Sequence, residues 1–166
     1  MKKLFVTGIL FTLLWIIFFP ASSHAEAVKL NSKYAEYTQF IVIDKSTNKL
    51  TYFEKGKAIK SFSVATGKKS SYTPEGLFPI HEKIKNRPYY KEKIKGGDPK
   101  NPLGDRWLGL EVKKNGHTSY AYGIHGNNNE SSIGKYVSAG CIRMHNKDIR
   151  WLYDKIKVNT LVLIQK

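Results

Sequence analysis

The sequence is poor in cysteine and in acidic residues, and both shortages limit what the protein can be. Its 166 residues include one cysteine, Cys141, so the chain cannot close an internal disulfide. Only 13 residues are Asp or Glu against 28 Lys or Arg, which gives a formal net charge of +15 at pH 7. Hydrophobic residues make up 41% and aromatic residues 13%, which suits one folded domain and excludes a disordered chain.

An uncharged segment near the N-terminus is shorter than a typical membrane span. The chain starts Met1-Lys2-Lys3, and the next 16 residues, up to Phe19, carry no charge, whereas a spanning helix needs about 20. The small residues Ser23 and Ala25 follow and complete the layout of a secretory signal peptide. We therefore predict a signal peptide over residues 1–25 and a protein secreted to the cell wall. An uncleaved anchor and a buried helix are the alternatives.

Short apolar runs separated by polar turns indicate β-strands. The run 40–43 is apolar and β-branched, a polar turn follows, and 50–53 runs back, which predicts a hairpin. The remaining strands are expected at 59–65, 77–80, 107–110, 120–124 and 160–164.

One helix is predicted near the C-terminus. Asn146 stands where its side chain could cap the first turn. The apolar residues that follow have the spacing of one buried helical face: Ile149, Leu152, Tyr153 and Ile156. Many short strands with one packed helix predict a mainly β domain.

The segment 83–104 interrupts the strand pattern with lysines, prolines and the pair Gly96-Gly97. So long a connection in a small domain predicts either a lid over a functional site or a mobile flap. Residues 26–37 are expected to be a short lead-in, and residues 38–165 a single folded domain.

His125 and Cys141 are the candidate catalytic pair. His125 ends an apolar strand and Cys141 follows a glycine shortly before the helix, so the two loops can meet at one end of a sheet. Because a neighbouring imidazole or cation lowers the pKa of a nucleophilic thiol, we predict that Cys141 is accessible and partly ionised. Gly140 would let backbone amides face a developing oxyanion, and Arg143 would add positive charge.

Four motifs carry a resemblance to a known family. They are Thr73-Pro74-x-Gly76, Asn101-Pro102-Leu103-Gly104-x-Arg106-Trp107, His125-Gly126 and Ser138-x-Gly140-Cys141-Ile142-Arg143-Met144. Together they resemble the L,D-transpeptidase catalytic domain of the YkuD type, found in cell-wall enzymes that cross-link peptidoglycan stem peptides. The resemblance extends from about residue 37 to residue 164.

This resemblance implies a β-sandwich-like fold with one packed helix. It also implies that Cys141 is the nucleophile, that His125 donates and accepts protons, and that the acyl group is carried as a thioester. Gly140 would lie in the oxyanion region, with Ser138 and Arg143 beside it. No cofactor or metal is implied.

The sequence departs from the family pattern at Ala139. Many members carry a second histidine immediately before the Gly-Cys pair, so a role assigned to that histidine cannot operate here. The base must then be His125, and a backbone carbonyl near Gly126 is our candidate for the group that orients it.

Other interpretations of the same residues remain open. Cys141 and His125 could be structural, or could bind zinc together with His145, although paired ligands and a fourth group are missing. Transfer to water would make the protein an L,D-carboxypeptidase-type hydrolase, and a purely basic surface would make it a non-catalytic wall-binding protein. A sortase fits less well, because the Thr-Leu-x-Thr-Cys signature is missing.

The positive charge predicts anionic partners. Export separates the protein from nucleic acid, so the expected partners are acidic stem peptides, as donor and acceptor, and anionic wall polymers. Removal of residues 1–25 would lower the net charge from +15 to +13. We expect a monomer that contacts the membrane only through the signal segment before cleavage.

Overall fold

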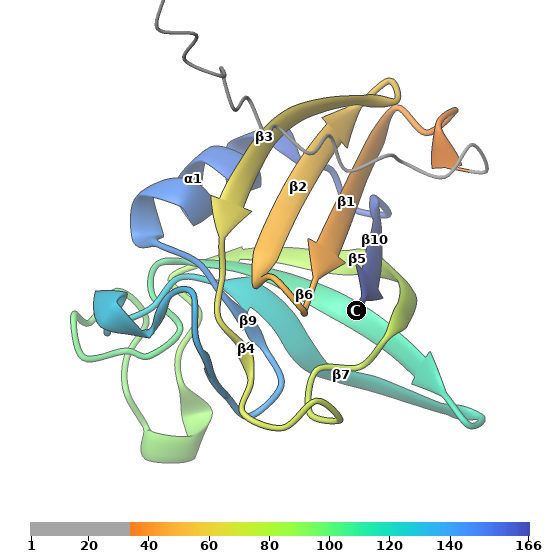
Figure 1. The fold of residues 1–166 in the computed structure, drawn as a ribbon. Helices are drawn as coiled ribbons and strands as arrows, with labels where there is room; N and C mark the ends of the chain where they lie inside the picture. The colour runs from red at the N-terminus through yellow and green to blue at the C-terminus, as the bar shows by residue number, and fades with distance from the viewer. Residues whose placement is uncertain (1–33) are drawn as a thin grey trace, which may run out of the picture.

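The computed structural model describes residues 34–166, so the predicted signal peptide over residues 1–25 lies outside the described residues. The described part is mainly β with one α-helix near the C-terminus, as expected (Figure 1). Its strands are β1 (Gln39–Asp44), β2 (Lys49–Glu54), β3 (Lys57–Ser63), β4 (Thr66–Gly67), β5 (Gly76–Lys85), β6 (Arg106–Lys114), β7 (His117–His125), β8 (Tyr136–Ser138), β9 (Ile142–Arg143) and β10 (Leu161–Gln165). The helix is α1 (Asn146–Lys155), and short 3₁₀ turns span Tyr90–Glu92 and Glu130–Ser132.

One bent sheet builds the domain. Eight strands are hydrogen-bonded in the order β3-β2-β1-β10-β5-β6-β7-β9, and β4 pairs separately with β8. The long strand β5 belongs to both halves of the sheet: its first residues pair with β10, its later residues pair with β6, and a register shift near Ile80 separates them. The two halves therefore face one another across a shared core, which gives the β-sandwich-like form (Figure 1).

The core lies between the two halves of the sheet and α1. Side chains from all three parts are fully buried there: Ile41, Ile43, Leu50, Ile80, Leu108, Leu110, Ile124, Ile149 and Leu152. Each such burial contributes about 1.5–3 kcal/mol relative to exposure. This packing fixes the ends of β7 and β9, where the predicted catalytic residues lie.

The helix begins at Asn146, the residue that was expected to cap it. His145 occupies the N-cap position, so the prediction that Asn146 caps the helix is wrong. The Asn146 side chain instead binds the backbone of Asn127, accepting from its N–H at 3.0 Å and donating to its carbonyl at 2.8 Å. The predicted buried face is present in Ile149 and Leu152. No helix within residues 34–166 is long and apolar enough to cross a membrane.

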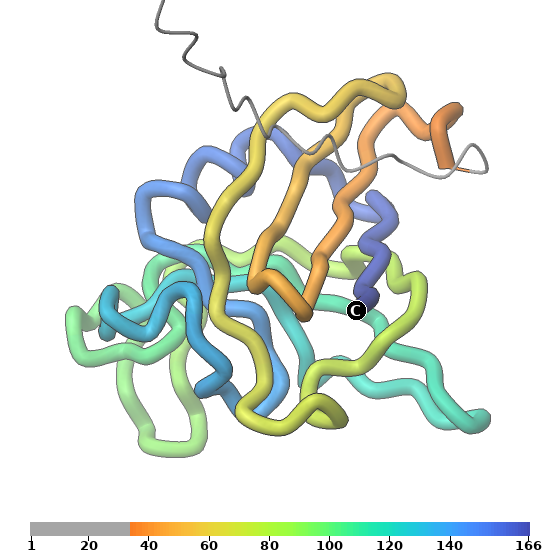
Figure 2. The backbone as a smooth tube through the Cα atoms, in the orientation of Figure 1, coloured from red at the N-terminus to blue at the C-terminus, as the bar shows by residue number. Residues whose placement is uncertain are grey.

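The strands around the predicted lid are longer than expected. Residues 83–85 pair with β6, so the connection begins at residue 86 rather than at 83. It lies beside the 126–140 segment (Figure 2), where Asn128 Nδ2 donates to the Lys100 carbonyl at 2.8 Å. The β6–β7 hairpin turns at Asn115 and Gly116, which both have positive φ, and this Asn-Gly turn is a hairpin signal that our sequence analysis missed.

Candidate active site

A cavity of about 350 Å³ contains both members of the predicted Cys–His pair. The 86–105 connection supplies part of its wall, as expected of a lid, and β7 and the β8–β9 turn supply most of the rest. The lining residues are Tyr89, Pro102, Leu103, Ala121, Tyr122, His125, Ser138, Ala139, Cys141 and Arg143. Four of the six predicted site residues therefore line this cavity: His125, Ser138, Cys141 and Arg143. The other two are chain neighbours of these residues, since Gly126 follows His125 and Gly140 precedes Cys141.

His125 is the last residue of β7 and is buried. Its Nδ1 lies 2.7 Å from the carbonyl oxygen of Gly126, so the expected orienting contact is present. A carbonyl can only accept, so in the neutral ring Nδ1 carries the hydrogen and Nε2 carries the free lone pair. His125 therefore has a defined tautomer with Nε2 available as a base.

The surroundings keep the His125 ring neutral. Burial lowers its pKa from 6.5 to about 4, and the positive charge of Arg143 acts in the same direction. The carbonyls of Gly126 and Leu103 favour the protonated ring but are outweighed by burial. At neutral pH, His125 is therefore unprotonated.

Cys141 is partly exposed and lies between β8 and β9. Its Sγ donates to the Ala121 carbonyl at 3.6 Å. Burial raises the pKa of the thiol above its ordinary value, although the charges of Arg143 and Arg87 act to lower it. The prediction of a partly ionised thiol is thus not met, because loss of solvent outweighs the nearby cations.

The turn before Cys141 is fixed by side-chain oxygens. Ser138 Oγ donates to the Cys141 carbonyl at 2.7 Å and accepts from the Gly140 N–H at 3.0 Å. The Gly140 amide is therefore already occupied, which leaves the Cys141 amide as the nearer oxyanion candidate. Thr73 Oγ1 donates to the Gly140 carbonyl at 2.9 Å.

Gly140 can only be glycine in this turn. Its φ is +139°, and a Cβ there would lie 2.7 Å from the Tyr72 carbonyl oxygen and 2.9 Å from a ring carbon of Tyr122. Any other side chain would strain the backbone and displace these neighbours. The glycine thus permits the close approach that brings Cys141 beside β7.

Arg143 lies directly opposite His125 in the parallel pairing of β7 and β9. Its backbone is fixed by reciprocal hydrogen bonds with Ala65, at 2.9 Å and 2.8 Å. Its charge lowers the pKa of both His125 and Cys141. Arg143 therefore supplies positive charge to the cavity, as predicted from the sequence.

A stack of side chains behind His125 was not anticipated. The Trp107 ring lies parallel to the imidazole, with centroids 5.4 Å apart, and the Arg87 guanidinium lies 4.3 Å from the Trp107 ring centroid. The Glu82 carboxylate oxygen Oε1 accepts hydrogen bonds from the Arg87 guanidinium at 2.6 Å and from Trp107 Nε1 at 3.0 Å. The motif containing Trp107 was visible in the sequence, but Glu82 and Arg87 lie outside every quoted motif.

The residues considered for zinc do not converge. His145 pairs with Glu130 through Nδ1. Within residues 34–166, no group of three or more His, Cys, Asp or Glu side chains is placed to hold a metal ion.

Known proteins resemble this chain in sequence and in fold. Residues 38–164 match the YkuD family of L,D-transpeptidase catalytic domains. The chain belongs to this L,D-transpeptidase family. It is 47% identical over 125 residues to YqjB of Bacillus subtilis, covering 75% of this chain and 70% of that protein. It is 36% identical over 126 residues to YkuD of B. subtilis, covering 76% of this chain and 65% of that protein. Both relatives carry L,D-transpeptidase in their names.

Solved L,D-transpeptidase structures share the fold of this domain at lower sequence identity. The catalytic domain of the Enterococcus faecium enzyme is 21% identical with a TM-score of 0.57, covering 78% of this chain and 98% of that one. A Mycobacterium tuberculosis L,D-transpeptidase is 18% identical with a TM-score of 0.61, covering 78% of this chain and 58% of that one. The present chain thus spans little more than half of the mycobacterial protein.

The buried neutral histidine should make this L,D-transpeptidase domain less stable in acid. Between pH 6.5 and 4 the unfolded chain protonates His125 while the folded chain does not, so the free energy of unfolding falls as pH falls. The loss should reach about 3 kcal/mol near pH 4. Urea unfolding of wild type and of His125→Gln, each at pH 7 and pH 4, measures this loss. Between the two pH values, the free energy of unfolding should fall by about 3 kcal/mol less in the variant than in wild type. Equal pH slopes would contradict the assignment.

Proposed function

We propose that the protein cross-links peptidoglycan stem peptides through a thioester on Cys141, with His125 as the proton carrier. One observation carries the proposal: Cys141 and His125 line one cavity, and the Gly126 carbonyl holds His125 in the tautomer with a free Nε2 lone pair. The class of substrate is the one on which the L,D-transpeptidase family acts.

The first half-reaction starts from two neutral groups. Cys141 Sγ attacks the carbonyl of the diamino-acid residue in a donor tetrapeptide while His125 Nε2 accepts the thiol proton. Because the thiol pKa is raised and the imidazole pKa is lowered, proton transfer and attack are best coupled in one step. The carbonyls of Gly126 and Leu103, which favour the protonated ring, stabilise the imidazolium that forms.

The tetrahedral intermediate then collapses to the thioester. Its oxyanion is stabilised by the positive charge of Arg143 and by the Cys141 amide. The C–N bond to the terminal D-alanine breaks, and His125 returns its proton to the leaving amine. An acceptor amine next attacks the thioester, His125 takes its proton, and the Cys141 thiol is restored as the new amide forms.

The experiment that tests this function is mass spectrometry of muropeptides after incubation with the protein lacking residues 1–25. Transfer to an amine gives cross-linked dimers together with released D-alanine. Shortened monomers without dimers would show that water is the acceptor, and unchanged muropeptides would remove the enzymatic proposal altogether.

We also propose that the protein is exported, cleaved after Ala25 and retained in the wall as a monomer. The support is the Lys2-Lys3 start, the 16 uncharged residues that follow, and Ser23 and Ala25. The secreted protein is expected to begin at Glu26. N-terminal sequencing of protein from the cell envelope checks this, and finding Met1 there would favour an uncleaved anchor.

A further inference from the structure

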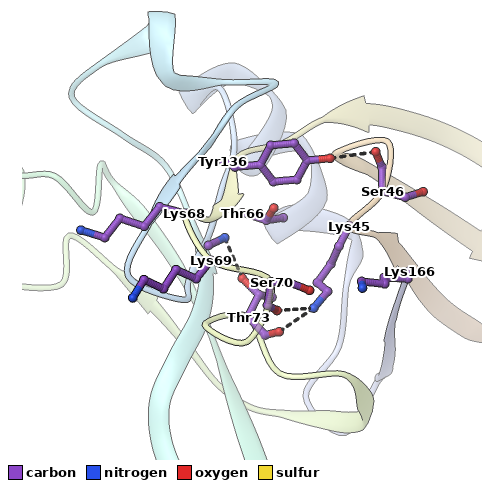
Figure 3. A pocket seen from close by; sticks show the side chains of 10 residues that line it. Lys45, Ser46, Thr66, Lys68, Lys69, Ser70, Thr73, Tyr136 and Lys166 are labelled. Carbon is purple, nitrogen blue, oxygen red and sulfur yellow. Dashed lines mark hydrogen bonds between the residues drawn. The ribbon is translucent and has the colours of Figure 1, made fainter.

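A second cavity, of about 360 Å³, is separate from the catalytic one and shares none of its lining residues. It lies between the β1–β2 turn, the segment that follows β4, and the strand β8 (Figure 3). Four lysines line it, Lys45, Lys68, Lys69 and Lys166, and no acidic side chain does. Four lysines gathered in one concave site indicate a binding role that is separate from catalysis.

The wall of this basic cavity is built around a buried lysine. Lys45 is 5% exposed, and its Nζ donates to the carbonyls of Ser70 at 2.7 Å and Thr73 at 3.0 Å. Glu75 pairs with the same ammonium at 2.9 Å. Lys45 thus has all three of its hydrogens engaged, so it fixes the wall and offers no free donor to a ligand.

A second contact holds the cavity from the other side. Tyr136, on β8, donates from its hydroxyl to the Ser46 carbonyl at 2.8 Å, which joins β8 to the β1–β2 turn. The Tyr136 ring is 51% exposed. The cavity is therefore a preformed concavity with an accessible aromatic surface, rather than a gap between mobile segments.

The remaining lysines supply further positive charge, which is offset in part by Glu75, whose pKa is lowered by Lys45 and further by the charge of Lys166. Lys68 and Lys69 extend on one side of the cavity, and Lys166 lies on the opposite side, beside Lys45 (Figure 3). All three of these lysines are exposed, and within residues 34–166 none of them forms an ion pair within 4 Å. The ammonium ends of Lys68 and Lys69 point away from Lys166 in Figure 3, so their charge lies at the rim of the cavity.

We propose that this basic cavity binds a phosphate group of a phosphodiester-linked polymer. The cavity offers lysine ammonium groups, which act as point charges and commonly bind phosphate. The Tyr136 ring and the lysine stems offer apolar surface to the carbon atoms between successive phosphates. A polymer also fits the excess of 28 basic over 13 acidic residues, which attracts a chain of negative charges from a distance.

This inference goes beyond the proposed catalytic function, because the ligand is bound rather than transformed. The two sites are nevertheless adjacent: Thr73 lines the basic cavity and donates to the carbonyl of Gly140, next to Cys141. A polymer held there would keep the nucleophile in the anionic region of the wall where its substrates are made.

The test compares two triple variants of equal net charge. One removes the free cations of the basic cavity, Lys68→Gln, Lys69→Gln and Lys166→Gln. The matched control removes exposed lysines elsewhere, Lys57→Gln, Lys147→Gln and Lys155→Gln. Calorimetric titration at about 0.15 M salt, where surface charges are screened beyond about 8 Å, uses a soluble glycerol phosphodiester oligomer, inorganic phosphate and polyglutamate as probes.

The cavity variant should bind the phosphodiester oligomer at least about tenfold more weakly than wild type, and the control should stay within about twofold. Tighter binding of the oligomer than of inorganic phosphate assigns the site to a polymer, and equal binding assigns it to free phosphate. Equal weakening in both triple variants would replace the site by diffuse surface charge. Polyglutamate could instead bind as tightly as the phosphodiester oligomer and be weakened equally by loss of the cavity lysines. That result would overturn the proposal that the cavity prefers phosphate. Thermal unfolding confirms that each variant is folded.

Discussion

Protein carrying Cys141→Ala is expected to form no cross-linked muropeptides and to gain no mass from a carbapenem. The lactam carbonyl of a carbapenem is an acyl donor, so attack by Cys141 Sγ forms an S–C bond, breaks the ring C–N bond and adds the whole mass of the compound. Without the sulfur the cavity loses the thiol that is proposed to make this bond. Intact-mass spectrometry followed by peptide mapping measures the adduct and should place it in wild type on the peptide that contains Cys141.

The control for this prediction is Ser70→Ala, which changes an exposed side chain outside the catalytic cavity and should leave the adduct unchanged. Circular dichroism verifies that both variants are folded. An adduct on the Cys141→Ala protein, or undiminished dimer formation by it, would show that another group carries the acyl transfer.

Replacing His125 by glutamine should slow carbapenem acylation by about 10²–10⁴-fold, the usual contribution of a positioned general base. The effect should be large here because the thiol pKa is raised, so few thiolates form without a base. Acylation of wild type should also slow as pH falls through about 4, where the ring takes a proton. Single-turnover rates across this pH range, followed by mass, measure both effects.

Trp107→Phe serves as the matched variant for the stack behind the imidazole. It keeps an aromatic ring beside His125 but loses the indole N–H that donates to Glu82 at 3.0 Å. It should therefore slow acylation much less than His125→Gln does. A His125→Gln protein that is folded and acylates at the wild-type rate would remove His125 from the mechanism.

Local patterns in the sequence predicted the elements that depend on neighbours in the chain. The 40–43 and 50–53 hairpin forms as β1 and β2, as predicted from two short runs rich in apolar residues that flank a polar turn. Likewise, Ile149 and Leu152 are buried because their spacing puts them on one face of α1. Three residues of the motif around Cys141 also line one cavity together with His125: Ser138, Cys141 and Arg143.

Properties set by distant segments could not be predicted in the same way. The pKa of Cys141 depends on how completely protein atoms replace water around the thiol, and part of the catalytic cavity is supplied by the lid, through residues such as Leu103. Asn146 fails as a helix cap because the Asn127 backbone, 19 residues earlier, binds its side chain instead. Thr73 was part of a recognised motif, yet its partner Gly140 lies 67 residues away.

The position of β10 determines when this domain can fold. The strand comes last in the sequence, yet it lies in the middle of the sheet, parallel to β1 and antiparallel to β5 (Figure 1). A nascent chain that has not reached Leu161 therefore lacks the strand that joins β1 to β5, and its longest-range pairings wait until β10 has been synthesised. The strand order thus delays completion of the sheet that positions Cys141 and His125 until β10 is available.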